Sequence, residues 1–249
     1  GISRRYKKKK IIKWDLIKKN NRKIKLKIDW IIHIAAIHKI QDFLKNNNNK
    51  RKNILMTKNL IEFAKKNHIK KFIFFSTIDI SNDKVFGNKR DYNLSKLKSE
   101  ELILKAYKKK IFEKVIILRI PAILGKNANQ NFLINTIKKL KKNKDIIIKD
   151  RSKYNNFVHI DDLSKLILNI INYCNTNKSK NSRFYNILNC LCSNYIHISK
   201  KILEIKKKLN SNSKIFLTTN RDNLKFITVK KNKFNFKFMS CNKAIKLIL

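Results

Sequence analysis

Short apolar runs alternate with amphipathic stretches along the first half of the chain. The runs lie at residues 11–14, 30–34, 72–75 and 115–120. Their near-continuous apolar character is typical of strands that are buried on both faces of a sheet. Residues 53–67 and 94–108 instead carry apolar side chains at helical spacing. Because crossover helices join parallel strands, this alternation predicts an α/β fold with a mainly parallel sheet.

The second half of the chain is less regular. An amphipathic helix is predicted after Asp161 and Asp162, which we interpret as capping residues because a helix dipole favours negative charge at its start. The segments 127–156 and 174–233 are richer in Asn, Lys and Ser. They are expected to form a smaller portion that is interleaved with the sheet domain.

Composition indicates a folded protein rather than a disordered one. The chain has 249 residues, of which 43% are hydrophobic, and this is enough for a full core. The formal net charge of +45 would ordinarily indicate a polyanionic partner. However, the lysines are spread from Lys7 to Lys246, which indicates a uniform composition bias. We therefore expect no specific nucleic acid partner, and a basic nucleic-acid-binding protein stays an alternative.

Neither a membrane segment nor a metal site is predicted. No apolar run reaches the ~18 residues of a membrane span and no signal peptide opens the chain, so we expect a cytoplasmic protein without a membrane partner. The cysteines lack the paired spacing of a zinc site and are interpreted as reduced structural thiols: Cys174, Cys190, Cys192 and Cys241.

The stretch Tyr92-Asn93-Leu94-Ser95-Lys96 carries a candidate acid/base pair. A free phenol is protonated at neutral pH, because its pKa is about 10. Lys96 lies four residues after Tyr92 and hence on the same helix face, so its ammonium is expected to lower the phenol pKa and allow proton exchange with a substrate oxygen. The hydroxyl of Thr77, or less favourably Ser76, would hydrogen-bond that oxygen. A chance helix-surface pair is the alternative in a lysine-rich chain.

The order of these residues resembles the short-chain dehydrogenase/reductase superfamily, and in particular its extended branch, the NAD-dependent epimerase/dehydratase family. A hydroxyl at a strand end followed by Tyr-x-x-x-Lys on a helix is the superfamily pattern. Further segments are similar to the family in the same order: residues 28–36, which end in His33-Ile34-Ala35-Ala36; Asn53, Thr57 and Asn59; residues 118–125; and residues 156–163.

This resemblance implies a Rossmann-like, doubly wound parallel sheet with a smaller interleaved C-terminal substrate-binding portion. Residues 1–120 and 157–173 would form the cofactor domain, and residues 121–156 and 174–249 would form the substrate-binding portion. The implied catalytic residues are Tyr92 as acid/base, Lys96, which tunes it and holds the nicotinamide ribose, and Thr77, which orients the reacting oxygen.

The resemblance also implies binding residues. Those for the cofactor, besides Tyr92 and Lys96, are Arg4, Arg5, Asp15, Leu16, Ala35, Ala36, Asn53 and Pro121, and those for the substrate are Thr77, Asn131 and Asn155. Several have a structural alternative: small core residues for Ala35 and Ala36, a strand terminator for Pro121, and a turn or helix cap for Asp15. His33 and His159 lie in apolar runs and are interpreted as core histidines.

Two departures from the family pattern change these expectations. The glycine-rich phosphate loop is missing, and too few residues separate Gly1 from Asp15 for Gly1 to supply it, so we expect the first strand and the loop to be lost by truncation. Residues 1–5 are interpreted as the end of the second strand. Arg4 and Arg5 suit the 2′-phosphate of NADP, which slightly favours NADP over NAD, with a solvated basic turn as the alternative.

The second departure is Asn155, which stands where many nucleotide-sugar enzymes of the family carry an arginine for the substrate diphosphate. It weakens the expectation of a nucleotide in the substrate more than that of redox chemistry. The resemblance thus implies an NAD(P)-dependent epimerase or oxidoreductase for a nucleotide sugar or related sugar, with a homodimer allowed. Ile78-Asp79 after Thr77 disfavours dehydration. The alternative is a catalytically impaired member that binds a dinucleotide or a partner.

Overall fold

A computed structural model of the chain describes residues 2–3, 12–20, 27–46, 48–81, 90–126, 128, 131–149, 153–176, 182–218, 227 and 232–249. It divides into two compact units. The first consists of Gly1–Arg119 and Cys174–Leu188, and the second of Ile120–Tyr173 and Asn189–Leu249.

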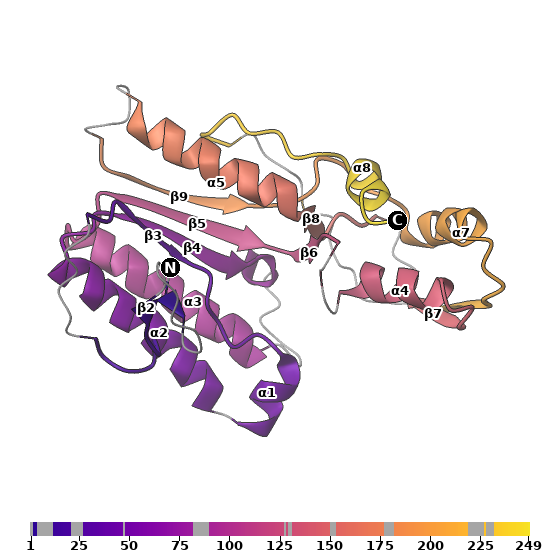
Figure 1. Cartoon of the computed structure of the whole chain (residues 1–249), viewed down its shortest axis with the longest axis horizontal. Coiled ribbons are helices and arrows are strands. Elements are labelled where there is room, and N and C mark those ends of the chain that lie inside the picture. The colour runs from indigo at the N-terminus through magenta and orange to yellow at the C-terminus, as the bar shows by residue number, and fades with distance from the viewer. Residues whose placement is uncertain are drawn as a thin grey trace. The chain divides into compact units, whose positions relative to one another are not determined.

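The first unit is built on a four-stranded sheet (Figure 1). Its strands, in hydrogen-bonded order, are β3 (Trp30–His33), β4 (Lys71–Thr77), β5 (Lys114–Ile120) and β9 (Phe184–Asn189). β3 and β4 are parallel, with Ile31 opposite Phe72. Their carboxyl ends therefore meet at one edge of the sheet, which is where ligands bind in open α/β folds.

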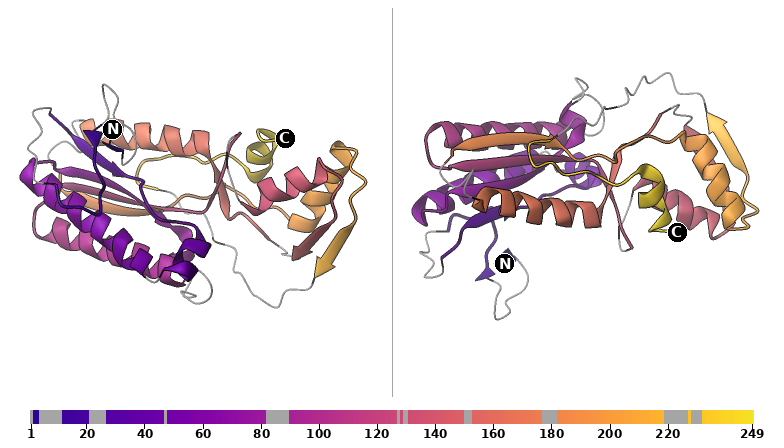
Figure 2. Two further views of the ribbon diagram at one scale, coloured as in Figure 1. Left: turned by 60° about the horizontal axis from the view of Figure 1, so that its bottom comes forward. Right: turned by 90° about the horizontal axis from the view of Figure 1, so that it is seen from above.

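Two long helices, α2 (Asn48–Lys66) and α3 (Arg90–Lys108), pack against each other in this unit. They stay side by side in every view (Figures 1 and 2). The unit also contains β1 (Ile2–Ser3), β2 (Ile12–Lys13), α1 (Ile40–Lys45) and the 3-10 helix η1 (Ile78–Ser81). β1 and β2 form a separate parallel pair, with Ile2 opposite Ile12.

The core of the first unit lies between these helices and the sheet. Phe72 and Phe112 are fully buried, and their ring centroids are 5.0 Å apart. Lys114 is almost fully buried at the start of β5, and its ammonium donates a hydrogen bond to the carbonyl of Cys174 (2.8 Å). Burial lowers the pKa of Lys114, because the charged form loses its hydration.

In its described residues the second unit has two short parallel strand pairs and four helices. β6 (Ala122–Leu124) pairs with β8 (Phe157–His159), and β7 (Ile146–Lys149) pairs with β10 (Ile215–Thr218). The helices are α4 (Phe132–Leu140), α5 (Ile160–Asn175), α7 (Ile198–Lys208) and α8 (Cys241–Lys246). Its apolar core includes the buried free thiols of Cys192 and Cys241.

The sequence predicted the first unit better than the second. All four predicted strands and both predicted helices are present, and the helices begin earlier than predicted, at Asn48 and Arg90. For the less regular segments 127–156 and 174–233 the sequence predicts no particular strand or helix, whereas their described residues hold α4, β7, β9, α7 and β10. In α7 the buried Ile198, Ile202 and Ile205 stand at helical spacing among lysines that obscure the pattern.

The two compact units also differ from the predicted domains. Residues 157–173 group with the second unit, and residues 174–188 group with the first, because β9 joins the sheet beside β5. Asp161 and Asp162 lie in the first turn of α5, as expected for residues that favour a helix start. In addition, the Asp162 carboxylate accepts a hydrogen bond from the backbone N–H of Met239 (2.7 Å).

Candidate active site

Tyr92 and Lys96 lie on the first two turns of α3, beside the end of β4. Lys96 is only 4% exposed, and its ammonium donates a hydrogen bond to the Phe75 carbonyl (2.7 Å). The ammonium lies 4.8 Å from the ring centroid of Phe74 and 5.9 Å from that of Tyr92. The tertiary structure thus brings the predicted pair to the carboxyl edge of the sheet.

Thr77, the third predicted catalytic residue, ends β4 at the same edge. Its hydroxyl oxygen accepts a hydrogen bond from the backbone N–H of Asp79 (3.3 Å). The neighbouring Ser76 is also buried, and its hydroxyl has no hydrogen-bond partner among the described residues. The edge therefore presents both hydroxyls that the sequence proposed, and Ser76 has the hydrogen-bonding capacity that is not yet used.

The environment of Tyr92 raises the pKa of its phenol to about 12. Burial is the main cause, and the Asp79 carboxylate adds to it because a nearby negative charge disfavours phenolate. This differs from the expected lowering by Lys96. The reason is geometric, since the ammonium of Lys96 is directed to the Phe75 carbonyl. The phenol of Tyr92 is therefore protonated at neutral pH.

Lys96 is itself perturbed, with its pKa lowered to about 8. Burial is the larger cause, and the nearby Glu100 carboxylate partly opposes it. Glu100 is held by Arg119, whose Nη2 and Nε donate to its two oxygens at 2.8 and 3.2 Å. Arg119 also donates to the Ser81 hydroxyl (3.2 Å). This buried pair fixes a negative charge one helical turn beyond Lys96.

His33 is a buried histidine at the end of β3, as the sequence predicted. Its Nε2 pairs with the Thr57 hydroxyl (3.1 Å), and its ring lies 5.3 Å from that of Phe74. Nδ1 has no hydrogen-bond partner among the described residues, so the histidine is only half satisfied. Burial first, and then the positive charge of Lys96, lower its pKa to about 3. His33 is therefore neutral in the folded protein.

We expect His33 to make the protein acid-sensitive. Between pH 6.5 and about 3 the unfolded chain protonates this imidazole and the folded chain does not. Unfolding then takes up a proton, so the free energy of unfolding falls by about 1.4 kcal/mol for each pH unit of acidification. Urea unfolding between pH 7 and 4.5 should show a shallower pH dependence for His33→Gln. Replacing the exposed His38 with Gln should leave the wild-type slope, and equal slopes for all three proteins would contradict the prediction.

A pocket of about 210 Å³ lies beside α2 in the same unit. It is lined by Trp14, Asp15, Leu16, Ile17, Ala35, Ala36, Ile37 and Met56. Four of the predicted cofactor residues, Asp15, Leu16, Ala35 and Ala36, therefore meet around one cavity. Asp15 also accepts a hydrogen bond from the N–H of Ile17 (3.2 Å), so its turn-forming role is present as well.

Helix α2 holds both walls of this pocket. The amide of Asn59 donates to the carbonyls of Leu16 (2.7 Å) and Ile17 (3.0 Å). One and a half turns earlier, the amide of Asn53 hydrogen-bonds both the N–H and the carbonyl of Ile37, each at 2.9 Å. Met56 lies between them and lines the pocket. Asn53 thus holds one wall of this pocket, and among the described residues its amide hydrogens are already engaged.

Comparison with protein families assigns the chain. A family model described as the NAD dependent epimerase/dehydratase family matches residues 1–187. The chain belongs to this family. A search of curated proteins gave no match.

Solved structures confirm the Rossmann-like fold of this family member. UDP-N-acetylglucosamine 4-epimerase from Methanobrevibacter ruminantium M1, in complex with UDP-N-acetylmuramic acid, is 18% identical with a TM-score of 0.73, covering 96% of this chain and 81% of that one. RMD from Pseudomonas aeruginosa, complexed with NADPH, is 16% identical with a TM-score of 0.72, covering 95% and 86%. The UDP-Glc/GlcNAc 4-epimerase of Campylobacter jejuni is 22% identical with a TM-score of 0.65, covering 96% and 77%.

The remaining residues that the family resemblance implied are not among those that line this pocket in the described part of the chain. Arg4 and Arg5 lie outside the described residues, while Pro121, Asn131 and Asn155 belong to the second unit. Asn131 caps α4 by accepting a hydrogen bond from the N–H of Ile134 (2.9 Å). Asn155 is buried and donates to the carbonyl of Ile227 (3.0 Å). Both have structural roles here, and their substrate contacts stay predictions.

Sequence reasoning missed several residues that line the pocket of this epimerase/dehydratase family member. Trp14, Ile17, Ile37 and Met56 complete its apolar wall. Trp14 ends a predicted strand, but its ring lies 5.1 Å from that of Phe63 on α2, and its indole N–H donates to the Lys18 carbonyl (2.8 Å). No local signal marks these positions, because core and pocket side chains are equally apolar. None of the helices in the described part of the chain combines the length and apolar character needed to cross a membrane.

Proposed function

We propose that this chain is an NAD(P)-dependent epimerase or oxidoreductase that acts on a nucleotide sugar or a related sugar, with Tyr92 as acid/base. The observation that carries the proposal is the meeting of Asp15, Leu16, Ala35 and Ala36 around one pocket, in the unit that also holds Tyr92 and Lys96. Membership of the NAD dependent epimerase/dehydratase family supports it.

The pocket suits the adenosine end of a dinucleotide. Trp14, Leu16 and Met56 offer apolar surface for a flat ring, and the Asp15 carboxylate is an acceptor for amino or hydroxyl groups. Such a cofactor, when bound, takes up or supplies a hydride. The preference for NADP is part of the proposal and depends on Arg4 and Arg5.

The residues of this chain would then carry out the proton transfer. Tyr92, protonated at neutral pH, donates to a substrate oxygen that gains negative charge. The positive charge of Lys96 stabilises the phenolate that results, and the buried Glu100 keeps Lys96 largely protonated. The Thr77 hydroxyl orients the same oxygen. The proton can return to Tyr92 in the reverse step, as an epimerase requires.

The substrate class comes from related structures and from the site. The UDP-glucose 4-epimerase of Thermotoga maritima was solved with UDP-glucose and is 15% identical to this chain, with a TM-score of 0.68. We propose a nucleotide sugar here too, with its diphosphate bound by groups other than Asn155, which donates to Ile227. Dehydration is not proposed, because Ile78 and Asp79 follow Thr77 where dehydratases of the family carry an Asp-Glu pair.

Nucleotide titration tests the cofactor pocket. We expect NADPH, and less strongly NADH, to bind with a change in nucleotide fluorescence, and weakly, since these 249 residues contain no glycine-rich phosphate loop. Ala36→Trp should weaken binding by at least about tenfold, because the indole fills the pocket that the adenosine needs. Lys58→Trp on the exposed face of α2 controls for the added tryptophan. The absence of saturable binding, or equal binding by Ala36→Trp, would overturn the proposal.

A catalytically impaired dinucleotide-binding member is the second candidate. The direction of the Lys96 ammonium toward the Phe75 carbonyl favours it, whereas the assembled Tyr92, Lys96 and Thr77 favour an enzyme. The two differ in one measurement, because the impaired protein binds NADPH but does not oxidise, reduce or epimerise any member of a nucleotide-sugar panel.

A further inference from the structure

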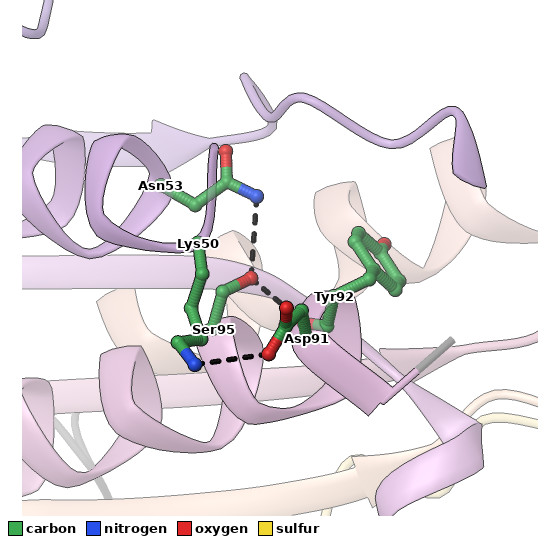
Figure 3. Close-up of polar contacts among 5 residues, drawn as sticks. All are labelled: Lys50, Asn53, Asp91, Tyr92 and Ser95. Carbon is green, nitrogen blue, oxygen red and sulfur yellow. Dashed lines mark hydrogen bonds and ion pairs between the residues drawn. The ribbon is translucent and has the colours of Figure 1, made fainter. Parts of the chain in front are cut away.

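A row of polar contacts joins α2 to α3 where apolar packing would be usual. Lys50 pairs with Asp91 (2.9 Å), the Asn53 amide donates to the Ser95 hydroxyl (3.2 Å), and the Thr57 hydroxyl donates to the Ser99 hydroxyl (3.0 Å). Figure 3 shows the first two contacts beside Tyr92. Buried polar groups need such partners, so this row specifies how the two helices align.

The contacts differ in their surroundings. Lys50 and Asp91 are 40% and 37% exposed, so their ion pair contributes little to stability. Asn53 and Ser95 are buried, and so are Thr57 and Ser99. Of the two buried contacts, only that of Asn53 and Ser95 reaches beyond the helices to both the pocket and Tyr92.

Asn53 uses its whole amide group. Its oxygen accepts from the N–H of Ile37, and its nitrogen donates both to the carbonyl of Ile37 and to the hydroxyl of Ser95. The Ser95 hydroxyl in turn donates to the carbonyl of Tyr92 (2.7 Å). A continuous line of hydrogen bonds therefore runs from the loop after β3, through α2, to the first turn of α3. Figure 3 shows its part from Asn53 through Ser95 to Tyr92.

The two segments that this line of hydrogen bonds joins both need stabilising contacts. The loop that holds Ala35, Ala36 and Ile37 lies beyond the end of β3 and lines the pocket. Tyr92 lies in the first turn of α3, where backbone N–H groups have no partner within the helix and fraying begins. Asparagine suits the junction because one planar group both donates and accepts; aspartate would only accept, and leucine would do neither.

We propose that Asn53, acting through Ser95, is a positioning residue that ties the cofactor-pocket loop to the turn carrying Tyr92. It fixes the distance between the nucleotide and the acid/base group without touching the reacting atoms. The part of this inference that concerns nucleotide and catalysis rests on the function proposed above. The hydrogen-bonded tie itself does not.

Two site-specific signals test the tie in the absence of nucleotide. One is hydrogen exchange at the Ile37 amide, and the other is the ring signal of Tyr92 in ¹³C-tyrosine-labelled protein, assigned with Tyr92→Phe. In Asn53→Ala we expect Ile37 exchange to be about tenfold faster, the factor for one lost hydrogen bond, and the Tyr92 signal to move. Ser95→Ala should move the Tyr92 signal. It should leave Ile37 exchange within about twofold of wild type, because the Ile37 N–H still donates to the Asn53 side chain in this variant.

Two matched variants act as controls. Ser99→Ala removes the next buried contact of the row and should change neither signal. Asn59→Ala releases the other pocket wall at Leu16 and Ile17 and should weaken NADPH binding with the Tyr92 signal unchanged. Where Asn53→Ala does not fold, Asn53→Asp replaces it, because the carboxylate keeps the Ile37 N–H contact but cannot donate to Ser95; the Tyr92 signal alone should then move.

The outcomes separate the two proposals. The tie is overturned when Asn53→Ala, or Asn53→Asp in its place, leaves the Tyr92 signal at its wild-type position, or when Ser99→Ala moves it equally. NADPH should shift the Tyr92 signal in wild type and in Ser99→Ala, and fail to do so in Asn53→Ala. A wild-type protein that does not bind NADPH at all overturns the proposed cofactor, while the nucleotide-free signals still decide the tie.

Discussion

Tyr92→Phe is expected to lower turnover by about 10²- to 10⁴-fold, which is the usual contribution of a positioned acid or base. The change removes one oxygen atom and leaves the ring that packs edge-on against Phe43, 5.9 Å away. Folding and NADPH binding should therefore remain close to wild type. Turnover is measured on a nucleotide-sugar panel by product analysis and by nicotinamide absorbance, and binding is measured by nucleotide fluorescence.

Tyr107→Phe is the matched control for this experiment. Tyr107 lies near the end of the same helix and packs edge-on against Tyr185, with 5.4 Å between ring centroids. Its turnover should equal that of wild type. Unchanged turnover in Tyr92→Phe would remove Tyr92 from the acid/base role. A loss of NADPH binding equal to the loss of turnover would instead give Tyr92 a role in the binding site.

Glu100→Gln is expected to lower the free energy of unfolding by about 3 kcal/mol, since breaking a buried ion pair leaves an unpaired buried charge. The Glu100 side chain is 3% exposed and that of Arg119 is 20% exposed, which places the loss at the lower end of the usual range. The pKa of Lys96 should also fall further, because the Glu100 carboxylate raises it. Urea unfolding at pH 7 measures the first effect.

The adjacent residue provides the control. Glu101 pairs with Lys98 at 2.8 Å, but the two side chains are 51% and 57% exposed. Glu101→Gln should therefore change the free energy of unfolding by less than about 0.5 kcal/mol. In the double variant Glu100→Gln/Arg119→Met, part of the loss should be recovered, because no unpaired charge remains. Equal losses in Glu100→Gln and Glu101→Gln would show that burial does not matter at this pair.

The elements that position the site were predictable because their signals are local. Continuous apolar runs marked β3 and β4, and helical spacing marked α2 and α3. The Tyr92–Lys96 spacing placed both side chains on one face of a helix, which depends only on helix geometry. The ordered segments around His33, Asn53 and Thr77 then indicated the family, which the family model confirmed over residues 1–187.

The pocket and the pKa values of the site residues were harder to predict from the sequence. Trp14 and Met56 are distant in the sequence and meet only because α2 holds the loops at Leu16 and Ile37. The pKa of Tyr92 is raised where a lowering by Lys96 was expected, since burial and Asp79 act on the phenol while the ammonium of Lys96 bonds the Phe75 carbonyl. The spacing of two residues along a helix predicts that their side chains are close, but the burial of the group and the direction of its charged neighbour set its pKa.

The sequence by itself determined the strands and helices that position the site, from β3 to β5, the placement of Thr77, Tyr92 and Lys96 on them, and the family, because each depends on local periodicity or on motifs in order. The tertiary structure alone decided which loops Asn53 and Asn59 hold, that Glu100 pairs with Arg119, and that the pKa of His33 falls to about 3. These depend on desolvation and on contacts between segments far apart in the chain, and no single stretch of residues predicts either of them.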